Sequence, residues 1–234
     1  MMDYKQEPGS AVSVASSTGT LCAPSLPMSG KRLHIQSNGI RLIWPPLPMS
    51  QKEVPIYSED GALVYVAAKD QAWTCRWVLS SPKQGPLVSI ECLPGGRPWL
   101  RRLDSGTGHA VPSIGLRAKW TSRAVTFAPS EGARTLEWKY VKMRMANSER
   151  LATLRLEQTE EREGLLHTQP VAHLVRGAPS CHAAGQGGEL ILESEGATGE
   201  VDEALVVASC LVMLRRERDR RRFVQAMVLG AAVS

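Results

Sequence analysis

The feature that most constrains the fold is an uncharged, mainly apolar run from Ala204 to Leu214. Eleven residues are too few to cross a bilayer, which needs about 20. Acidic residues precede the run and Arg215-Arg216 follow it, the charge order that favours a helix. A helix that is apolar on every side must be surrounded by other elements. The valines leave a buried strand as the alternative, but the length and the charged ends favour a helix near 201–216.

The rest of the chain is dominated by strand patterns. Trp73, Cys75, Trp77 and Leu79 alternate with polar residues, which predicts a strand with an aromatic inner face. The Asp60-Gly61 pair predicts a hairpin turn. A change of apolar parity near Tyr140 predicts a bulge in a long strand. Nine or ten strands are expected, over residues 54–57, 62–67, 73–80, 87–92, 119–127, 135–145, 151–157, 171–176 and 189–193, with polar loops at 158–164 and 177–188.

A closed sheet wrapped around the helix satisfies both patterns, because it covers the helix on every side and leaves no sheet edge exposed. We therefore predict a mainly β fold, an antiparallel closed barrel around a C-terminal hydrophobic helix. Residues 1–30 are rich in Ser, Gly, Pro and Ala and are expected to form a disordered tail. The barrel domain is expected over 31–222, followed by an apolar tail over 223–234.

Charge and cysteine content narrow the compartment and the chemistry. The net charge of +5 permits anionic partners without requiring them. The five cysteines are odd in number and include no C-x-x-C pair, which favours reduced thiols over a disulfide framework or a zinc ribbon. The N-terminal region lacks the apolar core of a signal peptide. We expect a cytoplasmic protein without a membrane-spanning segment.

Short segments in the second half resemble a family of uncharacterised fungal proteins that we associate with the tubby-like barrel. The similar segments lie between about residues 134 and 222 and are Leu136–Lys139, Val171–His173, Gly188–Leu192 and Val201–Ala208, followed by the arginine run. The fold is shared with LURP-one-related proteins and phospholipid scramblases. The resemblance implies about twelve strands threaded by a hydrophobic helix. By analogy it also implies phosphoinositide or phospholipid binding through basic surface residues.

The densest charge in the chain follows the apolar run directly. Its six arginines are Arg215, Arg216, Arg218, Arg220, Arg221 and Arg222, and the apolar stretch 223–233 comes next. Basic clusters beside apolar sequence are typical of sites for anionic lipids. The alternative is a solvated extension of the helix. Lys139, Lys142 and Arg144, predicted to face outward on their strand, are the further candidates for lipid contact.

Other motifs are weaker. Asp104-Ser105-Gly106 resembles the core of an aspartic protease, but that chemistry needs two carboxylates and the motif occurs once, so a polar turn is the preferred interpretation. His167, His173, Cys181 and His182 have no metal-ligand spacing. His173 fits a core or edge histidine, and the tryptophans Trp73, Trp77, Trp120 and Trp138 fit core packing better than a stacking platform.

We therefore predict a non-enzymatic barrel without a cofactor or metal, which binds anionic phospholipid, such as phosphoinositide, at a membrane surface. The alternative is a protein-interaction or structural module without a small ligand. An enzyme whose cavity holds Asp104 beside a second carboxylate is a third possibility. Nucleic acid is the least favoured partner, because Glu217 and Asp219 dilute the arginines.

Overall fold

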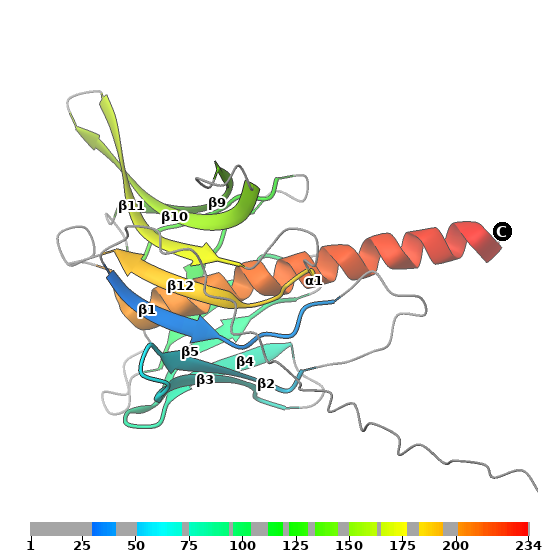
Figure 1. Cartoon of the computed structure of the whole chain (residues 1–234), viewed down its shortest axis with the longest axis horizontal. Helices are drawn as coiled ribbons and strands as arrows, with labels where there is room; N and C mark the ends of the chain where they lie inside the picture. The colour runs from blue at the N-terminus through cyan, green and yellow to red at the C-terminus, as the bar shows by residue number, and fades with distance from the viewer. Residues whose placement is uncertain are drawn as a thin grey trace, which may run out of the picture.

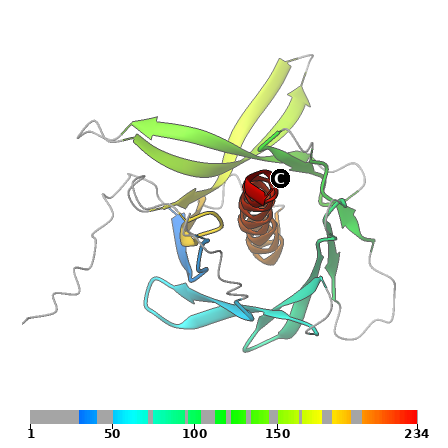
Figure 2. The ribbon, with the colours of Figure 1, turned by 90° about the vertical axis from the view of Figure 1, so that its right-hand side faces the viewer.

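A computed structural model of the chain describes residues 30–40, 51–71, 75–93, 96–103, 112–118, 122–130, 134–144, 150–162, 165–176, 183–193 and 201–233. The strands form one antiparallel sheet that rolls into a nearly closed barrel, and a single helix runs along its axis (Figure 1). The view along the helix shows the sheet surrounding it (Figure 2). The predicted fold class is confirmed. The expected tail over 1–30 lies outside the described residues, apart from Gly30 at the start of the first strand.

Twelve strands make up the sheet, in the order β7-β6-β5-β4-β3-β2-β1-β12-β11-β10-β9-β8. Neighbours in this order are also neighbours in sequence except at β1 and β12, so the topology is a meander joined between its first and last strands. The strands are β1 (Gly30–Ile35), β2 (Glu53–Ser58), β3 (Leu63–Lys69), β4 (Arg76–Ser81), β5 (Gly85–Glu91), β6 (Trp99–Arg102), β7 (Ile114–Gly115), β8 (Val125–Phe127), β9 (Thr135–Arg144), β10 (Arg150–Arg162), β11 (Leu165–Val175) and β12 (Gly188–Glu193).

The two ends of the sheet meet at one backbone bridge. Arg117, two residues after β7, donates its N–H to the carbonyl of Thr126 in β8 at 2.8 Å, and the Thr126 N–H returns a bond to the Arg117 carbonyl at 2.9 Å. This bridge joins the outermost strands, which would otherwise present unpaired backbone groups.

Alternate residues of each strand fill the space between the sheet and the helix. Trp138 of β9, Leu156 of β10 and Ala172 of β11 lie side by side in the ladder and are fully buried. The indole Nε1 of Trp138 donates to the Ser209 hydroxyl at 2.9 Å, and that hydroxyl donates to the Val206 carbonyl at 2.9 Å. The one polar side chain of the enclosed helical run is thus fully bonded. The prediction of core packing is confirmed for Trp138, whereas Trp73 and Trp120 lie outside the described residues.

The helix α1 (Glu203–Val233) begins at one mouth of the barrel. Asp202 caps it, since its carboxylate accepts the Ala204 N–H at 3.0 Å and also an Arg102 bond at 2.5 Å. The carboxylate of Glu203 accepts bonds from Lys31 at 2.7 and 2.8 Å and from the Tyr65 hydroxyl at 3.0 Å. Acidic side chains at the helix start are favoured by the helix dipole, as the sequence indicated.

Every residue from Ala204 to Leu214 is buried, so the prediction of an enclosed apolar helix is confirmed. The helix continues well beyond the expected range 201–216, through the arginine run and on to Val233. Arginine, glutamate, alanine and methionine are good helix formers, and Arg215 pairs with Asp219 one turn on. Cations favour a helix C-terminus but do not end a helix. Residues 223–233 are therefore part of α1.

Two local expectations, a hairpin and a bulge, have opposite outcomes. The Asp60-Gly61 hairpin is confirmed, with Gly61 at φ +80° and the Ser58 N–H bonded to the Ala62 carbonyl. The bulge near Tyr140 is wrong: β9 and β10 pair without a shift, and Val141 is simply an apolar residue on the outer face, opposite Thr153. The register shift lies instead between β10 and β11, between Leu156 and Glu157.

The loop expected at 158–164 is also wrong over most of its length. It belongs to a long β10–β11 hairpin that extends beyond the rest of the sheet (Figure 1). Its residues are polar because its faces are not covered by a core, as the exposed residues His167, Thr168 and Gln169 show. The strands β1, β6 and β7 were missed. The last two are short and place few apolar residues, among them Leu100 and Ile114, against the core.

Candidate functional site

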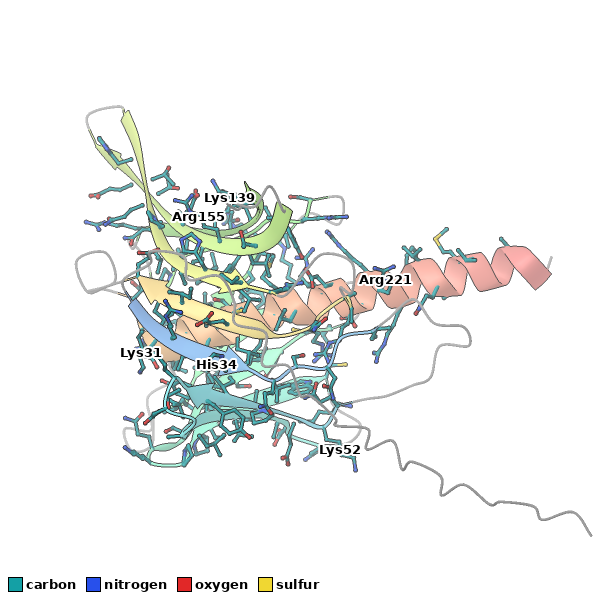
Figure 3. The ribbon with its side chains drawn as sticks, viewed as in Figure 1. Lys31, His34, Lys52, Lys139, Arg155 and Arg221 are labelled. Carbon is teal, nitrogen blue, oxygen red and sulfur yellow. The ribbon has the colours of Figure 1, made fainter. Side chains whose placement is uncertain are left out.

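The arginine run lies where α1 leaves the barrel, and Arg221 marks this position in Figure 3. We call the residues Arg215–Arg222 the exit segment. Figure 1 shows that the helix continues from here as a projecting rod. The exit segment is therefore bordered by the barrel rim on one side and by an exposed helix on the other.

The first arginine of the exit segment is fixed to the barrel. Arg215 donates from Nη1 to the carbonyl of Cys75 at 3.1 Å and from Nη2 to the carbonyl of Cys92 at 3.3 Å. Cys75 and Cys92 flank β4 and β5, and the Cys92 N–H also donates to the Cys75 carbonyl at 3.4 Å. Arg215 thus bonds the helix to the rim of the barrel and has a structural role.

Glu217 is the centre of a partly buried polar cluster. One carboxylate oxygen accepts a bond from the Tyr140 hydroxyl, and the other accepts from Arg176 Nη1 at 2.8 Å and from the Gly185 N–H at 2.9 Å. Burial, followed by the charge of Glu217, raises the pKa of Tyr140, so this phenol stays a neutral donor. The acid that appeared to dilute the arginines instead joins the helix to β9, to the residue after β11 and to the loop before β12.

The loop around Gly185 is shaped to the helix. Gly185 has φ +76°, and a Cβ there would lie 2.2 Å from Cγ of Arg218 and 2.5 Å from the Leu214 carbonyl oxygen. Its own carbonyl accepts a bond from Ser37 at 2.9 Å. This close approach explains why a glycine occupies this position.

The remaining arginines divide into partly covered and exposed ones. Burial, followed by neighbouring arginines, lowers the pKa of Arg216 and of Arg218. Arg220 donates from Nη2 to the carbonyl of Ser122. Arg221 is half-buried at the rim, and Arg222 is exposed.

A cavity of about 420 Å³ opens beside the exit segment. It is lined by Arg123, Tyr140, Arg176, Ala183, Ala184, Glu217, Arg220, Arg221 and Val224. Four arginines and one glutamate give it a strongly positive lining. Arg123 lies with its guanidinium carbon 5.6 Å from the centre of the Tyr140 ring, a cation–π contact.

Within this cavity Arg176 is incompletely bonded. The residue is 8% exposed, and among the described residues neither Nε nor Nη2 has a hydrogen-bond partner. A buried guanidinium normally satisfies its N–H groups, because each unbonded one costs about 1–3 kcal/mol. Arg176 therefore brings two buried N–H-bearing nitrogens to the cavity lining that no described residue satisfies.

The helix beyond the exit segment carries large exposed apolar side chains. Phe223, Val224, Met227 and Val228 are 49, 54, 60 and 60% exposed. We call residues Phe223–Val233 the projecting end. Four such side chains close together are more than the scattered apolar residues of an ordinary surface.

The strand candidates for lipid contact lie elsewhere. Lys139 and Arg155 are register partners on the outer face of β9 and β10, and Figure 3 shows both away from Arg221. Lys139 Nζ forms an ion pair with the buried Glu157, which Arg155 Nε also approaches at 3.2 Å. The side chains of Lys142 and Arg144 lie outside the described residues.

The structure gives little support to the weaker sequence motifs. Asp104, Cys181 and His182 lie outside the described residues. His167 is exposed, and His173 is buried with Nε2 3.1 Å from Glu193 Oε1. Burial is the main cause, and the charge of Arg155 the second, of a pKa of His173 lowered to about 4. The imidazole that contacts Glu193 is therefore neutral. No cluster of metal-ligating side chains occurs in the described part of the chain.

A second hollow of about 890 Å³ lies along the seam between β7 and β8. This hollow is larger than the cavity beside the exit segment, but Arg117 is the one charged residue among those that line it. Size alone does not make a binding site, and the polar groups that fix a ligand converge instead at the exit segment.

No known protein-family model, curated protein or solved structure is significantly similar to this chain. No helix in the described ranges is long and apolar enough to cross a membrane. The site must therefore be interpreted from its own chemistry.

Sequence reasoning found the arginine run but not its partners. Arg123, Arg176 and Gly185 come from separate loops and strands, and only the closed sheet brings them to the exit segment. Glu217 offered one signal: an acid within six arginines, one turn from the last buried apolar residues, is well placed to pair with a basic side chain of the barrel.

Proposed function

We propose that this protein binds the surface of membranes that contain anionic phospholipids. The projecting end enters the headgroup region and the outer part of the hydrocarbon, and Arg221 and Arg222 lie at the level of the lipid phosphates. The observation that carries the proposal is the group of exposed apolar side chains on the projecting end, immediately after the arginines.

The dimensions and charges of the projecting end suit a lipid surface. Its eleven residues of helix are about 16 Å long, about half of the ~30 Å hydrocarbon core of a bilayer. Moving a large apolar side chain fully out of water contributes about 1.5–3 kcal/mol. Each basic residue near an anionic surface adds about 1 kcal/mol. Charge and apolar area thus act together, as in other peripheral membrane helices.

The structure changes which basic residues we assign to lipid contact. Arg215 and Glu217 bond the helix to the barrel, and Lys139 is paired on another face. Arg221 and Arg222 stand next to the apolar residues and are the better candidates. The proposed tubby-like resemblance supports the same function by analogy, because related barrels bind phospholipids, but it does not identify the residues.

The test is flotation of the full chain with phosphatidylcholine vesicles, with and without phosphatidylserine. We expect binding to the anionic vesicles that weakens as salt is raised. The double variant Phe223→Ser, Met227→Ser should lower the affinity at least about tenfold, because it removes apolar area from the contact. Leu93→Ser, which alters an equally exposed apolar residue on another part of the barrel, should bind as the parent does.

The alternative occupant of the projecting end is another protein helix, including one from a second copy of this chain. Light scattering on the same variants separates the two. A dimer that the Phe223→Ser, Met227→Ser variant disrupts, together with no flotation of the parent, would reject the membrane proposal and favour an interaction module.

A further inference from the structure

We propose that the cavity beside the exit segment binds a phosphomonoester, that is, a terminal phosphate group with two negative charges. The phosphate could be carried by a lipid headgroup or by a small soluble compound. The lipid source rests on the proposed function, but the site itself does not.

The unbonded edge of Arg176 is the first support. Nη1 is occupied by Glu217, while Nε and Nη2 have no hydrogen-bond partner among the described residues. Nε–H and Nη2–H point the same way from the planar guanidinium and match two oxygens of one phosphate. Because Glu217 holds Nη1 and Arg176 is more than nine-tenths buried, this edge is fixed before any ligand arrives.

The charge balance indicates a dianion. Arg123, Arg176, Arg220 and Arg221 line the cavity, and Glu217 is the one acidic residue among the lining residues. Both carboxylate oxygens of Glu217 already accept bonds from the protein. The lining is therefore rich in cations, and a phosphomonoester, whose second pKa lies near 6 and which then carries two negative charges, matches it better than a single carboxylate does.

The neighbouring groups position the other arginines around that edge. Arg123 rests on the Tyr140 ring, and Arg220 is held by the Ser122 carbonyl. A volume of about 420 Å³ accommodates a phosphate and part of the group that carries it. The small side chains of Ala183 and Ala184 leave that room open.

Two binding measurements test the proposal and separate the two sources. The first compares flotation with vesicles containing phosphatidic acid, whose headgroup is a phosphomonoester, and vesicles containing phosphatidylserine at equal surface charge. The second measures the rise in Tm caused by glycerol 3-phosphate. We expect the parent to favour phosphatidic acid at least about tenfold, or to be stabilised by glycerol 3-phosphate, or both.

Variants assign the effect to the cavity. Arg176→Lys keeps the charge but loses the two-pronged edge, and Arg221→Gln removes a lining charge. Each should abolish most of the preference and of the Tm shift. Arg101→Gln, an exposed arginine on β6, is the matched control and should keep both. If Arg176→Lys lowers the Tm of the ligand-free protein strongly, Arg221→Gln decides.

The outcomes distinguish this site from the membrane proposal. Equal binding to both vesicle types and no Tm shift would overturn the phosphate site while leaving membrane binding intact. Failure of all vesicle binding with a retained glycerol 3-phosphate shift would do the reverse, and would make the ligand a soluble compound. A preference that both variants retain would place the phosphate elsewhere and overturn the assignment.

Discussion

The two apolar stretches of α1 have similar composition and opposite surroundings. Ala204–Leu214 is buried on every side by the barrel, whereas Phe223, Val224, Met227 and Val228 of the projecting end are exposed. The barrel explains the first stretch completely, since a helix without a polar face needs cover. Phe223, Val224, Met227 and Val228 are not covered in this way. Large apolar side chains that stay exposed to water are the more informative sign of a contact surface.

Within the exit segment, which lies between the two stretches, the charged residues have different roles. Arg215 and Glu217 bond the helix to the barrel, while Arg222 is exposed and Arg221 lines a cavity. The number of charges in the exit segment therefore does not reveal which of them contact the barrel. The residues of the exit segment differ in whether they face the rim of the barrel. The rotation of the helix at the mouth of the barrel decides which of them do.

The largest expected difference in unfolding free energy is between two variants that place the same charge in the enclosed stretch and in the projecting end. Val207→Asp puts a carboxylate in the enclosed stretch, where Val207 is fully buried, and should cost more than about 4 kcal/mol of unfolding free energy. Val228→Asp adds the same group to the projecting end and should change the unfolding free energy by less than about 0.5 kcal/mol. Urea denaturation followed by the fluorescence of Trp138 and the other tryptophans measures both.

Similar losses for the two variants would break the comparison, because they would mean that the projecting end is as necessary to the fold as the enclosed stretch. Val228→Asp should also weaken vesicle binding, so the pair separates stability from function.

The next effect concerns the two acids of the exit segment. Glu217→Gln removes the partner of the buried Arg176 and should cost about 2–4 kcal/mol. Asp219→Asn removes an exposed acid whose oxygen lies 3.9 Å from Arg215 Nε, and should cost less than about 0.5 kcal/mol. Thermal unfolding of both variants, at one ionic strength, gives the difference. Equal costs would mean that the bonds of Glu217 add no net stability.

Much of the fold was predictable because one segment imposed it. The buried helix followed from Ala204–Leu214, and the need to cover that helix implied a closed sheet. Strands with clear alternation, such as β2, β3 and β5, were also recognised. The β10–β11 hairpin was missed in part because its outer half is polar, so its strand pairing comes from backbone bonds rather than from an apolar pattern.

The site was only partly predictable for a different reason. Its arginines on the helix are contiguous in sequence, but Arg123 and Arg176 reach it from distant segments, and neither differs in its local sequence from any surface arginine. The role of Gly185 depends on the path of a loop against Arg218. Such features exist only after closure of the sheet, and a single sequence gives no direct sign of them.

The smallest expected effect is the finest test of whether the two stretches are independent. Ala208→Gly in the enclosed stretch should cost about 1.5 kcal/mol, because it lowers helix propensity and removes a buried methyl group. Gly230→Ala is the inverse change in the projecting end, where an added Cβ would meet nothing within 4 Å. It should raise helix content, measured by circular dichroism, yet move the tryptophan-detected unfolding free energy by less than about 0.3 kcal/mol. A gain comparable to the loss at Ala208 would show that α1 folds as one cooperative unit through the exit segment. The exposed apolar residues would then have a structural role, and their assignment to membrane binding would lose its main support.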